Sequence, residues 1–273
     1  MDNEFLSPKS DIIFKLLFGD ERSLEMLTDF LKAVLRLPAD DYEEVFFVDP
    51  HLKPERGGDK LGILDVRVRT KSKKTIDIEI QLLPSPELRE RVVYYSAKMV
   101  TEQIGSGDPY STIKRVISII ITDYVLIPES EKYHNRYTLY DPETKSEFTD
   151  IIEVNTLELV KLPENEDGTD LWVWMKFLSA RSKEELNMIA KNSPQVQKAV
   201  ARLMELSSDE RTRLLYESRQ KMEWDNRARE QGAREEERVA FAKKLIMRNR
   251  PINEIIEDTG LTREEVEGLD NRG

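Results

Sequence analysis

The octapeptide TIDIEIQL, residues 75–82, decides the fold of the region around it. Isoleucine or leucine occupies every second position, and Thr75, Asp77, Glu79 and Gln81 stand between them. Because successive side chains of a strand point to opposite faces, this alternation predicts a strand with one apolar and one polar face. The polar face fits two interpretations: a face open to solvent, or a metal site built on the carboxylates.

A second alternating segment, ILDVRVRT at residues 63–70, precedes this strand. The short polar connection TKSKKT favours an antiparallel hairpin between them. A register that pairs Arg67 with Asp77 keeps the two apolar rows together, and a slip of one residue would separate them. The same register places Asp65 opposite Glu79.

Two carboxylates opposed in this way repel each other, since directly opposite side chains lie close together. A hard cation between Asp65 and Glu79 would remove the repulsion. Carboxylate and carbonyl oxygens suit Mg²⁺ or Mn²⁺, and the carbonyl of Ile80 could supply a third ligand. The hairpin is therefore either a solvated surface or a divalent-metal site.

Composition narrows the class of protein. The chain has 273 residues, 39% of them hydrophobic and 35% charged, enough for one large or two moderate domains. Without cysteine there is no disulfide or thiolate metal site, which fits a cytoplasmic protein. No segment has the length and hydrophobicity of a membrane span or a signal peptide. The net charge of −11 argues against a general nucleic-acid coat protein but leaves room for a local basic channel.

The remaining patterns predict a mixed α/β core at residues 1–163. Its expected helices lie at 9–19, 21–38 and 85–104, and its further strands at 45–48, 115–122, 136–154 (a hairpin turning at Asp141-Pro142) and 157–163, after a loop at 49–62. Helices at 164–206 are expected to pack on this core. Residues 207–273 predict a charged, solvated helix that ends in two short helices with the rhythm of a helix-turn-helix. Three glutamates on the last helix would repel phosphate, which favours packing or self-association over DNA reading.

The segments ILDVRV (63–68) and IDIEIQ (76–81) together resemble the D…(D/E)xK core of the PD-(D/E)XK nuclease superfamily. The chain is most similar to its Rpn branch, the recombination-promoting nucleases also described as transposases, in which glutamine replaces the usual lysine. Other segments agree with that branch in order and spacing: SDIIFKLLFG (10–19), LRERVVYYSAKMV (88–100), GDPYSTIKRVISIIIT (107–122) and the C-terminal segment 242–269.

The resemblance implies a restriction-endonuclease-like fold and metal-dependent hydrolysis of DNA. Asp65 and Glu79 match the metal-binding pair, and Gln81 matches the lysine position. Asp11 matches an acidic residue that often completes the site, although it could equally pair with Lys15 one turn later. Gln81 carries no charge, so either the rate is low or Lys15 supplies the missing cation.

Two groups of residues are candidates for DNA contact. Arg91, Tyr95 and Lys98 recur on one helix face, where they could meet phosphates and bases, or where Tyr95 could pack on the sheet. Lys71, Lys73 and Lys74 lie at the hairpin tip, where they could grip the DNA backbone or simply favour solubility.

Two functions remain open at this stage. The first is a cytoplasmic Mg²⁺-dependent DNA endonuclease of a mobile element, of recombination or of defence, which would act as a homodimer through its C-terminal helices. The second is a catalytically weak or inactive protein of the same fold that serves as an interaction partner. The convergence of Asp11, Asp65 and Glu79 on one point would favour the endonuclease.

Overall fold

A computed structural model of the chain describes residues 5–52, 63–191 and 193–270. Most of the predicted loop at 49–62 lies outside the described residues. The chain forms two compact units, Met1–Tyr216 and Glu217–Gly273, and each is described by itself below. The first unit extends beyond the expected limit at residue 206, because Thr212 and Tyr216 are buried within it.

The first unit is built on a six-stranded mixed sheet with the order β1-β2-β3-β4-β6-β5. The pairs β3–β4 and β4–β6 are parallel, and the other neighbours are antiparallel. All seven residues of β4 are buried, as expected of a central strand covered on both faces. The strands are β1 (Val45–Phe47), β2 (Val66–Thr70), β3 (Thr75–Gln81), β4 (Val116–Thr122), β5 (His134–Tyr140) and β6 (Glu147–Glu158).

The hairpin register predicted from the sequence is confirmed for residues 66–69, whereas Leu64 and Asp65 precede β2 and lie outside its paired residues. Arg67 lies opposite Asp77, and Val66 and Val68 lie opposite Ile78 and Ile76. The apolar row is buried in the main core. The expected ion pair differs, however, because the Arg67 guanidinium donates to Glu102 at 2.8 Å instead of to Asp77.

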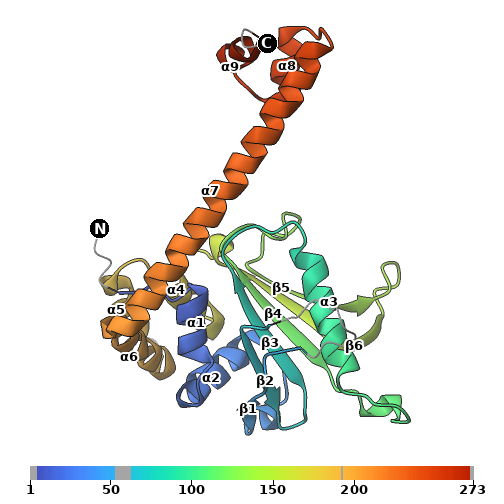
Figure 1. Cartoon of the computed structure of the whole chain (residues 1–273). Coiled ribbons are helices and arrows are strands. Elements are labelled where there is room, and N and C mark those ends of the chain that lie inside the picture. The colour runs from blue at the N-terminus through green and yellow to red at the C-terminus, as the bar shows by residue number, and fades with distance from the viewer. Residues whose placement is uncertain (1–4, 53–62, 192, 271–273) are drawn as a thin grey trace. The chain divides into compact units, whose positions relative to one another are not determined.

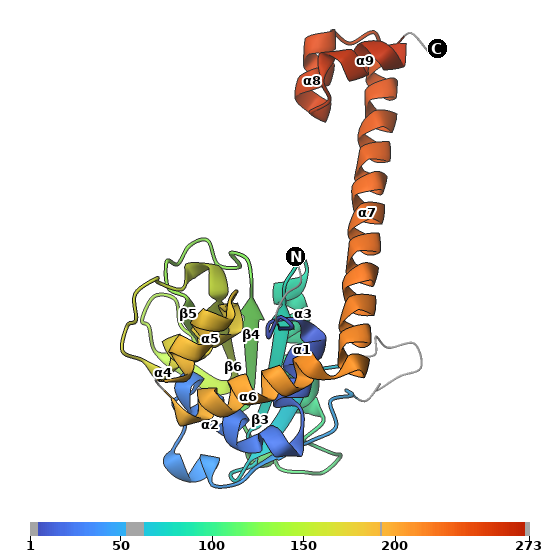
Figure 2. The ribbon, with the colours of Figure 1, turned by 90° about the vertical axis from the view of Figure 1, so that its left-hand side faces the viewer.

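Helices cover both faces of the sheet (Figure 1). The crossover helix α3 (Leu88–Thr101) connects the parallel strands β3 and β4, as parallel pairing requires, and packs on one face through Leu88, Val92 and Met99. The other face carries α1 (Asp11–Phe18), α2 (Leu24–Val34), α4 (Asp170–Ser179), α5 (Lys183–Ala190) and α6 (Pro194–Ser208) (Figure 2).

Aromatic side chains connect α4 to the N-terminal helices. The Trp174 ring meets the rings of Phe18, Phe30 and Phe177 at centroid distances of 5.7–5.9 Å, and all four side chains are fully buried. The indole N–H of Trp174 donates to Asp29 at 3.0 Å. The segment predicted to pack on the core is therefore part of that core.

Two predicted elements are wrong in detail. The strand expected at 157–163 is not separate, because β6 continues to Glu158 and a 3₁₀ turn, Leu159–Lys161, follows. The helix expected at 21–38 is shorter, since a 3₁₀ turn, Glu21–Ser23, precedes α2. Two further 3₁₀ turns occupy Ala39–Tyr42 and Tyr110–Thr112.

The second unit holds most of α7 (Glu210–Met247), with α8 (Ile252–Thr259) and α9 (Arg263–Asp270). Ala242, Leu245, Ile255, Leu261 and Val266 form its small core. Gly260 ends α8 with φ +65°, the left-handed conformation typical of a helix C-cap. The Arg238 side chain donates to the carbonyls of Thr259 and Gly260.

Replacing Gly260 by alanine should destabilise the second unit by about 1 kcal/mol, because a Cβ in left-handed backbone is strained. The added Cβ would also lie 3.3 Å from the Arg238 guanidinium. Thermal unfolding followed by circular dichroism on the full chain measures the effect. Gly232→Ala is the control, because a Cβ added at this position of α7 would meet open space, and the change should be neutral or stabilising.

Candidate active site at the end of the central hairpin

The polar face of β3 is not a solvated surface. Asp77 is 1% exposed and Glu79 is 7% exposed, because α3 packs over this face of the sheet. One oxygen of Asp77 is buried with no hydrogen-bond partner among the described residues. Buried carboxylates are costly unless they are paired or bind a metal, so this burial favours a specialised site.

Asp65 directly precedes the first residue of β2, and its carboxylate has two partners. One carboxylate oxygen accepts a hydrogen bond from the backbone N–H of Ile80 at 3.1 Å, which fixes the side chain against β3. The other oxygen forms an ion pair with Lys15 of α1 at 2.9 Å. Because the N–H and C=O of a strand residue point to the same side, the Ile80 carbonyl also faces the side where Asp65 stands.

The electrostatics of the three hairpin carboxylates are coupled. Burial raises the pKa of Glu79 to about 7; the positive charge of Arg91 opposes this rise and the negative charge of Asp65 adds to it. Burial, and then the charges of Glu79 and Asp65, raise the pKa of Asp77 well above its ordinary value. Carboxylates perturbed in this way, beside the partly exposed side chains of Lys15 and Arg91, are typical of functional sites.

Arg91 and Gln81 complete this group. The Arg91 Nη2 atom lies 3.0 Å from Gln81 Oε1 and 3.8 Å from Glu79 Oε2. Gln81 Nε2 donates in turn to the carbonyl of Leu83 at 3.0 Å. The Arg91 side chain is 36% exposed, so this cationic group reaches the surface. We refer to Lys15, Asp65, Glu79, Gln81 and Arg91 as the hairpin-end site.

Asp11 lies at the first position of α1. Its carboxylate accepts a hydrogen bond from the N–H of Ile12 at 2.8 Å, at the start of α1. Within the described ranges, no three histidine, aspartate or glutamate side chains gather as a group that could hold a metal ion. The role of Asp11 as a metal ligand therefore stays a prediction, and the hairpin-end site is built on Asp65 and Glu79 with Lys15 beside them.

The face of α3 that carries Arg91, Tyr95 and Lys98 points toward the sheet. Tyr95 is half-buried against an apolar cluster that includes Leu64 and Met99. Lys98 is 7% exposed, and its ammonium lies 5.2 Å from the centre of the Tyr94 ring. Lys98 is buried and Tyr95 is half-buried, so contact of these two residues with DNA stays a prediction, and Arg91 is the member of this set that lies at the hairpin-end site.

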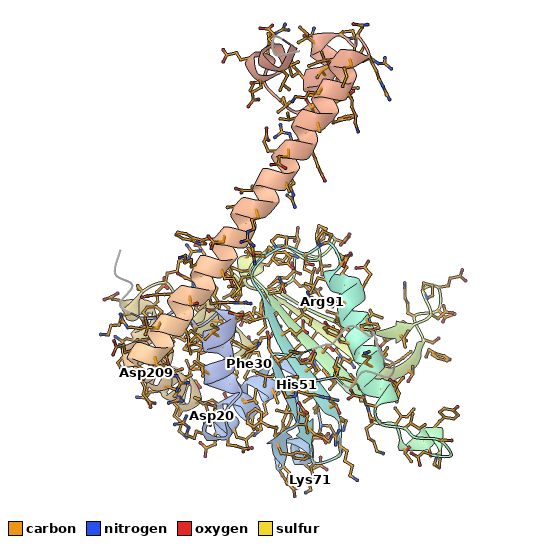
Figure 3. The ribbon with its side chains drawn as sticks, in the orientation of Figure 1. Asp20, Phe30, His51, Lys71, Arg91 and Asp209 are labelled. Atoms are coloured by element: carbon orange, nitrogen blue, oxygen red, sulfur yellow. The ribbon has the colours of Figure 1, made fainter. Side chains whose placement is uncertain are left out.

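The lysines of the hairpin tip are far from the hairpin-end site. Four steps along β3, each of about 3.3 Å, separate Thr75 at the tip from Glu79 by about 13 Å. Figure 3 shows Lys71 at the opposite end of the sheet from Arg91.

Two of these lysines also have acidic partners nearby. Lys71 pairs with Glu43, and Lys74 pairs with Asp41, each at 2.5 Å. Burial alone would raise the pKa of Asp41, but hydrogen bonds from Lys74 and Ser72 bring that pKa below its ordinary value. Lys74 is therefore a structural residue, and Lys73 is exposed at the turn with φ +67°.

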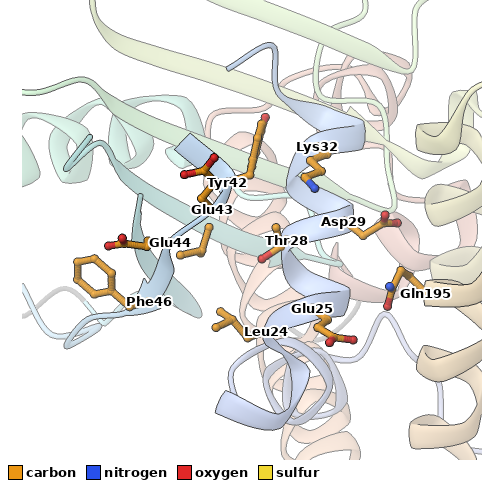
Figure 4. Close-up of a pocket in the computed structure, with 11 residues that line it drawn as sticks. Leu24, Glu25, Thr28, Asp29, Lys32, Tyr42, Glu43, Glu44, Phe46 and Gln195 are labelled. Atoms are coloured by element: carbon orange, nitrogen blue, oxygen red, sulfur yellow. The ribbon is translucent and has the colours of Figure 1, made fainter. Parts of the chain in front are cut away.

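A hollow of about 580 Å³ lies elsewhere, between α2, the segment 42–46 and Gln195 (Figure 4). Four carboxylates line it against one ammonium, that of Lys32, and no residue of the hairpin-end site is among its lining residues. This charge repels phosphate, so the hollow is not a nucleic-acid site. The acidic side chains are Glu25, Asp29, Glu43 and Glu44.

The sequence did not predict the partners of two residues in this region. The hydrogen bond of Arg91 to Gln81 was not foreseen. Asp77 was expected to pair with Arg67, whereas Glu102, directly after α3, accepts from that guanidinium. The i, i+4 and i+7 spacing of Arg91, Tyr95 and Lys98 does identify one helix face, but it does not say whether the face is turned inward.

The mixed six-stranded sheet, its flanking helices and the acidic hairpin define an α/β protein with a restriction-endonuclease-like fold. The chain belongs to the PD-(D/E)XK nuclease family transposases, whose family model matches residues 8–233. That family connects the chain with nuclease and transposase function. Searches of curated proteins and of solved structures gave no significant match. Among the helices that the structure describes, none has the length and hydrophobicity to cross a membrane.

Proposed function

We propose that the protein is a divalent-metal-dependent DNA endonuclease whose active centre is the hairpin-end site. The observation that carries this proposal is the position of Asp65 beside Glu79: Asp65 accepts a hydrogen bond from the N–H of Ile80, the residue after Glu79, and its negative charge adds to burial in raising the pKa of Glu79. Two like charges held together in a buried place favour the binding of a cation. The family membership gives the reaction class, hydrolysis of a phosphodiester.

The residues present fit Mg²⁺ or Mn²⁺. Asp65 and Glu79 would hold the ion, together with the backbone carbonyl of Ile80, an all-oxygen set that both ions accept. Such an ion polarises the scissile phosphate and lowers the pKa of water. Lys15 forms an ion pair with Asp65 here, and its ammonium could instead meet a phosphate oxygen when DNA is bound.

The protein side chains have separate roles toward DNA. Lys15 lies beside the acidic pair and attracts the phosphate backbone, although the whole chain carries a net charge of −11. Gln81 holds no charge and acts by hydrogen bonding. Lys73 at the hairpin tip is an additional, more distant candidate for backbone contact.

The wider setting follows from the family and remains a proposal. Transposition, recombination and defence against foreign DNA all use such an enzyme, and a cytoplasmic location gives it access to DNA. Cutting both strands needs two active sites, so we propose a homodimer. Exposed apolar side chains of α7, among them Met222 and Trp224, support an interface through the C-terminal helices.

Plasmid cleavage by the purified full chain tests the proposal. We expect nicking of supercoiled DNA with Mg²⁺ or Mn²⁺ and none with EDTA. Asp65→Asn, purified in the same way, should lose the activity, because it removes the charge but keeps an oxygen that can accept from Ile80. Equal nicking by both proteins would indicate a contaminating nuclease. No nicking by either, on single-stranded, linear and supercoiled DNA, would contradict an endonuclease.

The ion pair between Lys15 and Asp65 favours a second candidate, a non-catalytic interaction protein, because an internal ammonium neutralises the site without a metal. Thermal unfolding at pH 8 distinguishes the two. For a metal site, Mg²⁺ at ten times its dissociation constant should add about 1.4 kcal/mol of stability. Asp65→Asn should abolish this gain. A melting temperature that Mg²⁺ and Mn²⁺ leave unchanged would favour the interaction protein.

A further inference from the structure

Gln81 occupies the position where the resemblance places a lysine, and its own side chain brings no charge to the site. The guanidinium of Arg91 reaches Gln81 from the first turn of α3. The connection from β3 to α3 is only six residues long, 82–87, and contains Pro84 and Pro86. Proline fixes φ, so this short connection restricts where the first turns of α3 can lie relative to the end of β3.

The two hydrogen bonds of Gln81 fix the orientation of its amide. Arg91 can only donate, so the atom that faces it must be the carbonyl oxygen Oε1. The backbone carbonyl of Leu83 can only accept, so the atom that faces it must be Nε2. If the amide were flipped, its NH₂ group would face the N–H donor of Arg91 and its oxygen would face the carbonyl of Leu83. Neither pair can form a hydrogen bond, so both partners exclude the flipped amide.

This orientation has a chemical consequence. Gln81 Oε1 accepts a hydrogen bond from Arg91 Nη2, and one of the two N–H groups of Nε2 donates to the carbonyl of Leu83. The second N–H of Nε2 is left as a donor, which suits a phosphate oxygen. The same arrangement makes Gln81 a poor proton acceptor.

Arg91 meets both key side chains through one nitrogen. Nη2 makes the bond to Gln81 and lies 3.8 Å from Glu79, and its charge lowers the pKa of that carboxyl against the effect of burial. Arginine stays charged at all relevant pH values and has five N–H donors. In the described part of the chain, Nε and Nη1 make no hydrogen bond that would prevent them from meeting a phosphate.

We propose that Arg91 is a positioning residue, which holds Gln81 as a hydrogen-bond donor and supplies from α3 the positive charge that Gln81 lacks. This inference rests on the proposed nuclease function. Two residues together take the role of one lysine: the Gln81 amide supplies the oriented hydrogen-bond donor, and the Arg91 guanidinium supplies the positive charge. Arg91 acts through Gln81 and is therefore distinct from a general phosphate anchor.

A double-mutant cycle on the full chain tests this assignment, with single-turnover cleavage rate and DNA affinity measured separately. Arg91→Ala should lower the cleavage rate about 10- to 100-fold, the usual cost of losing an orienting partner. In a Gln81→Lys background, where the lysine carries its own charge, Arg91→Ala should have less than a third of that effect. Arg91→Lys should recover part of the wild-type rate.

A plain phosphate anchor would give a different result. Arg91→Ala would then cost the same factor in both backgrounds, and the loss would appear in DNA affinity and its salt dependence; that outcome would overturn the proposal. Arg89→Ala is the matched control, since Arg89 lies on the same helix and contacts Leu126 and Glu129 away from the site. It should leave the rate unchanged.

A readout without catalysis separates failure of this inference from failure of the proposed function. The side-chain amide of Gln81 gives NMR signals that report its hydrogen bonds. Arg91→Ala should shift these signals and speed their exchange with solvent, and Arg89→Ala should not. If Arg91→Ala changed neither the shifts nor the solvent exchange of these signals, the positioning role would be overturned even in an active enzyme. A clear shift in a protein that cuts no DNA would support the contact and reject the nuclease.

Discussion

Replacing Glu79 by glutamine is expected to lower the rate of metal-dependent DNA cleavage about 100-fold or more. The change keeps the shape of the side chain and removes the charge with which it would hold a divalent ion. A loss of about 3 kcal/mol of transition-state stabilisation corresponds to a factor of that size. Plasmid nicking under single-turnover conditions, with Mg²⁺ and with Mn²⁺, measures it.

The same substitution is expected to stabilise the metal-free protein at neutral pH. Burial raises the pKa of Glu79 from an ordinary value of 4.5 to about 7, so ionisation of the folded protein is costly. Between those two pH values the folded state binds more protons than the unfolded state. Stability is therefore favoured at low pH and is lost as pH rises through about 7, by about 3 kcal/mol at most. Glutamine does not titrate, so the variant should show a flatter dependence in this window.

Urea unfolding of both proteins in EDTA, at several pH values from 4.5 to 8, tests the stability effect. Glu90→Gln is the control, because Glu90 lies on the exposed side of α3 and should change neither cleavage nor the pH dependence. Asp77 titrates in the same direction as Glu79 and stays in both proteins, so some slope will remain. A Glu79→Gln protein that is less stable than wild type at pH 8 would show that the carboxylate is a structural partner and not a strained ligand.

The hairpin was predictable because its information is local. Alternation in 63–70 and 75–82 fixes which side chains share a face, and the requirement that both apolar rows be buried selects one register. The burial of β4 follows equally from its unbroken apolar sequence. These features depend on neighbours in sequence and on a single hydrophobic face, and both can be read without knowledge of the tertiary structure.

The surroundings of the hairpin could not be read in the same way. Whether the polar face of β3 meets solvent or a helix depends on α3, and its charged residues suggested a surface helix. Lys71 and Lys74 have acidic partners about thirty positions earlier in the chain, a distance over which sequence spacing carries no geometric information. Gln81 and Arg91 are ten residues apart, yet their contact depends on how the connection at 82–87 turns.

Replacing Trp174 by alanine is expected to cost the first unit about 3–5 kcal/mol of folding stability, the usual range for a large aromatic side chain removed from a core. Trp174 is 1% exposed and contacts Phe18 and Phe30 from α1 and α2, so the cavity would open between helices from both ends of this unit. The change would also remove the hydrogen bond that Asp29 accepts from the indole N–H of Trp174.

Urea unfolding followed by far-ultraviolet circular dichroism measures this loss without relying on tryptophan fluorescence. Phe148→Ala is the matched control, because that aromatic side chain is 86% exposed on β6 and its removal should change stability by less than about 0.5 kcal/mol. Since a domain of this kind is typically stable by about 5–15 kcal/mol, the Trp174→Ala protein should be marginally folded. A loss below about 1 kcal/mol would mean that α4 packs weakly and that the sheet with α1–α3 folds without it. A loss in the full range would mean that the helices after residue 164 belong to the folding unit that holds Lys15 against Asp65, so a truncated nuclease core would lose its site together with its stability.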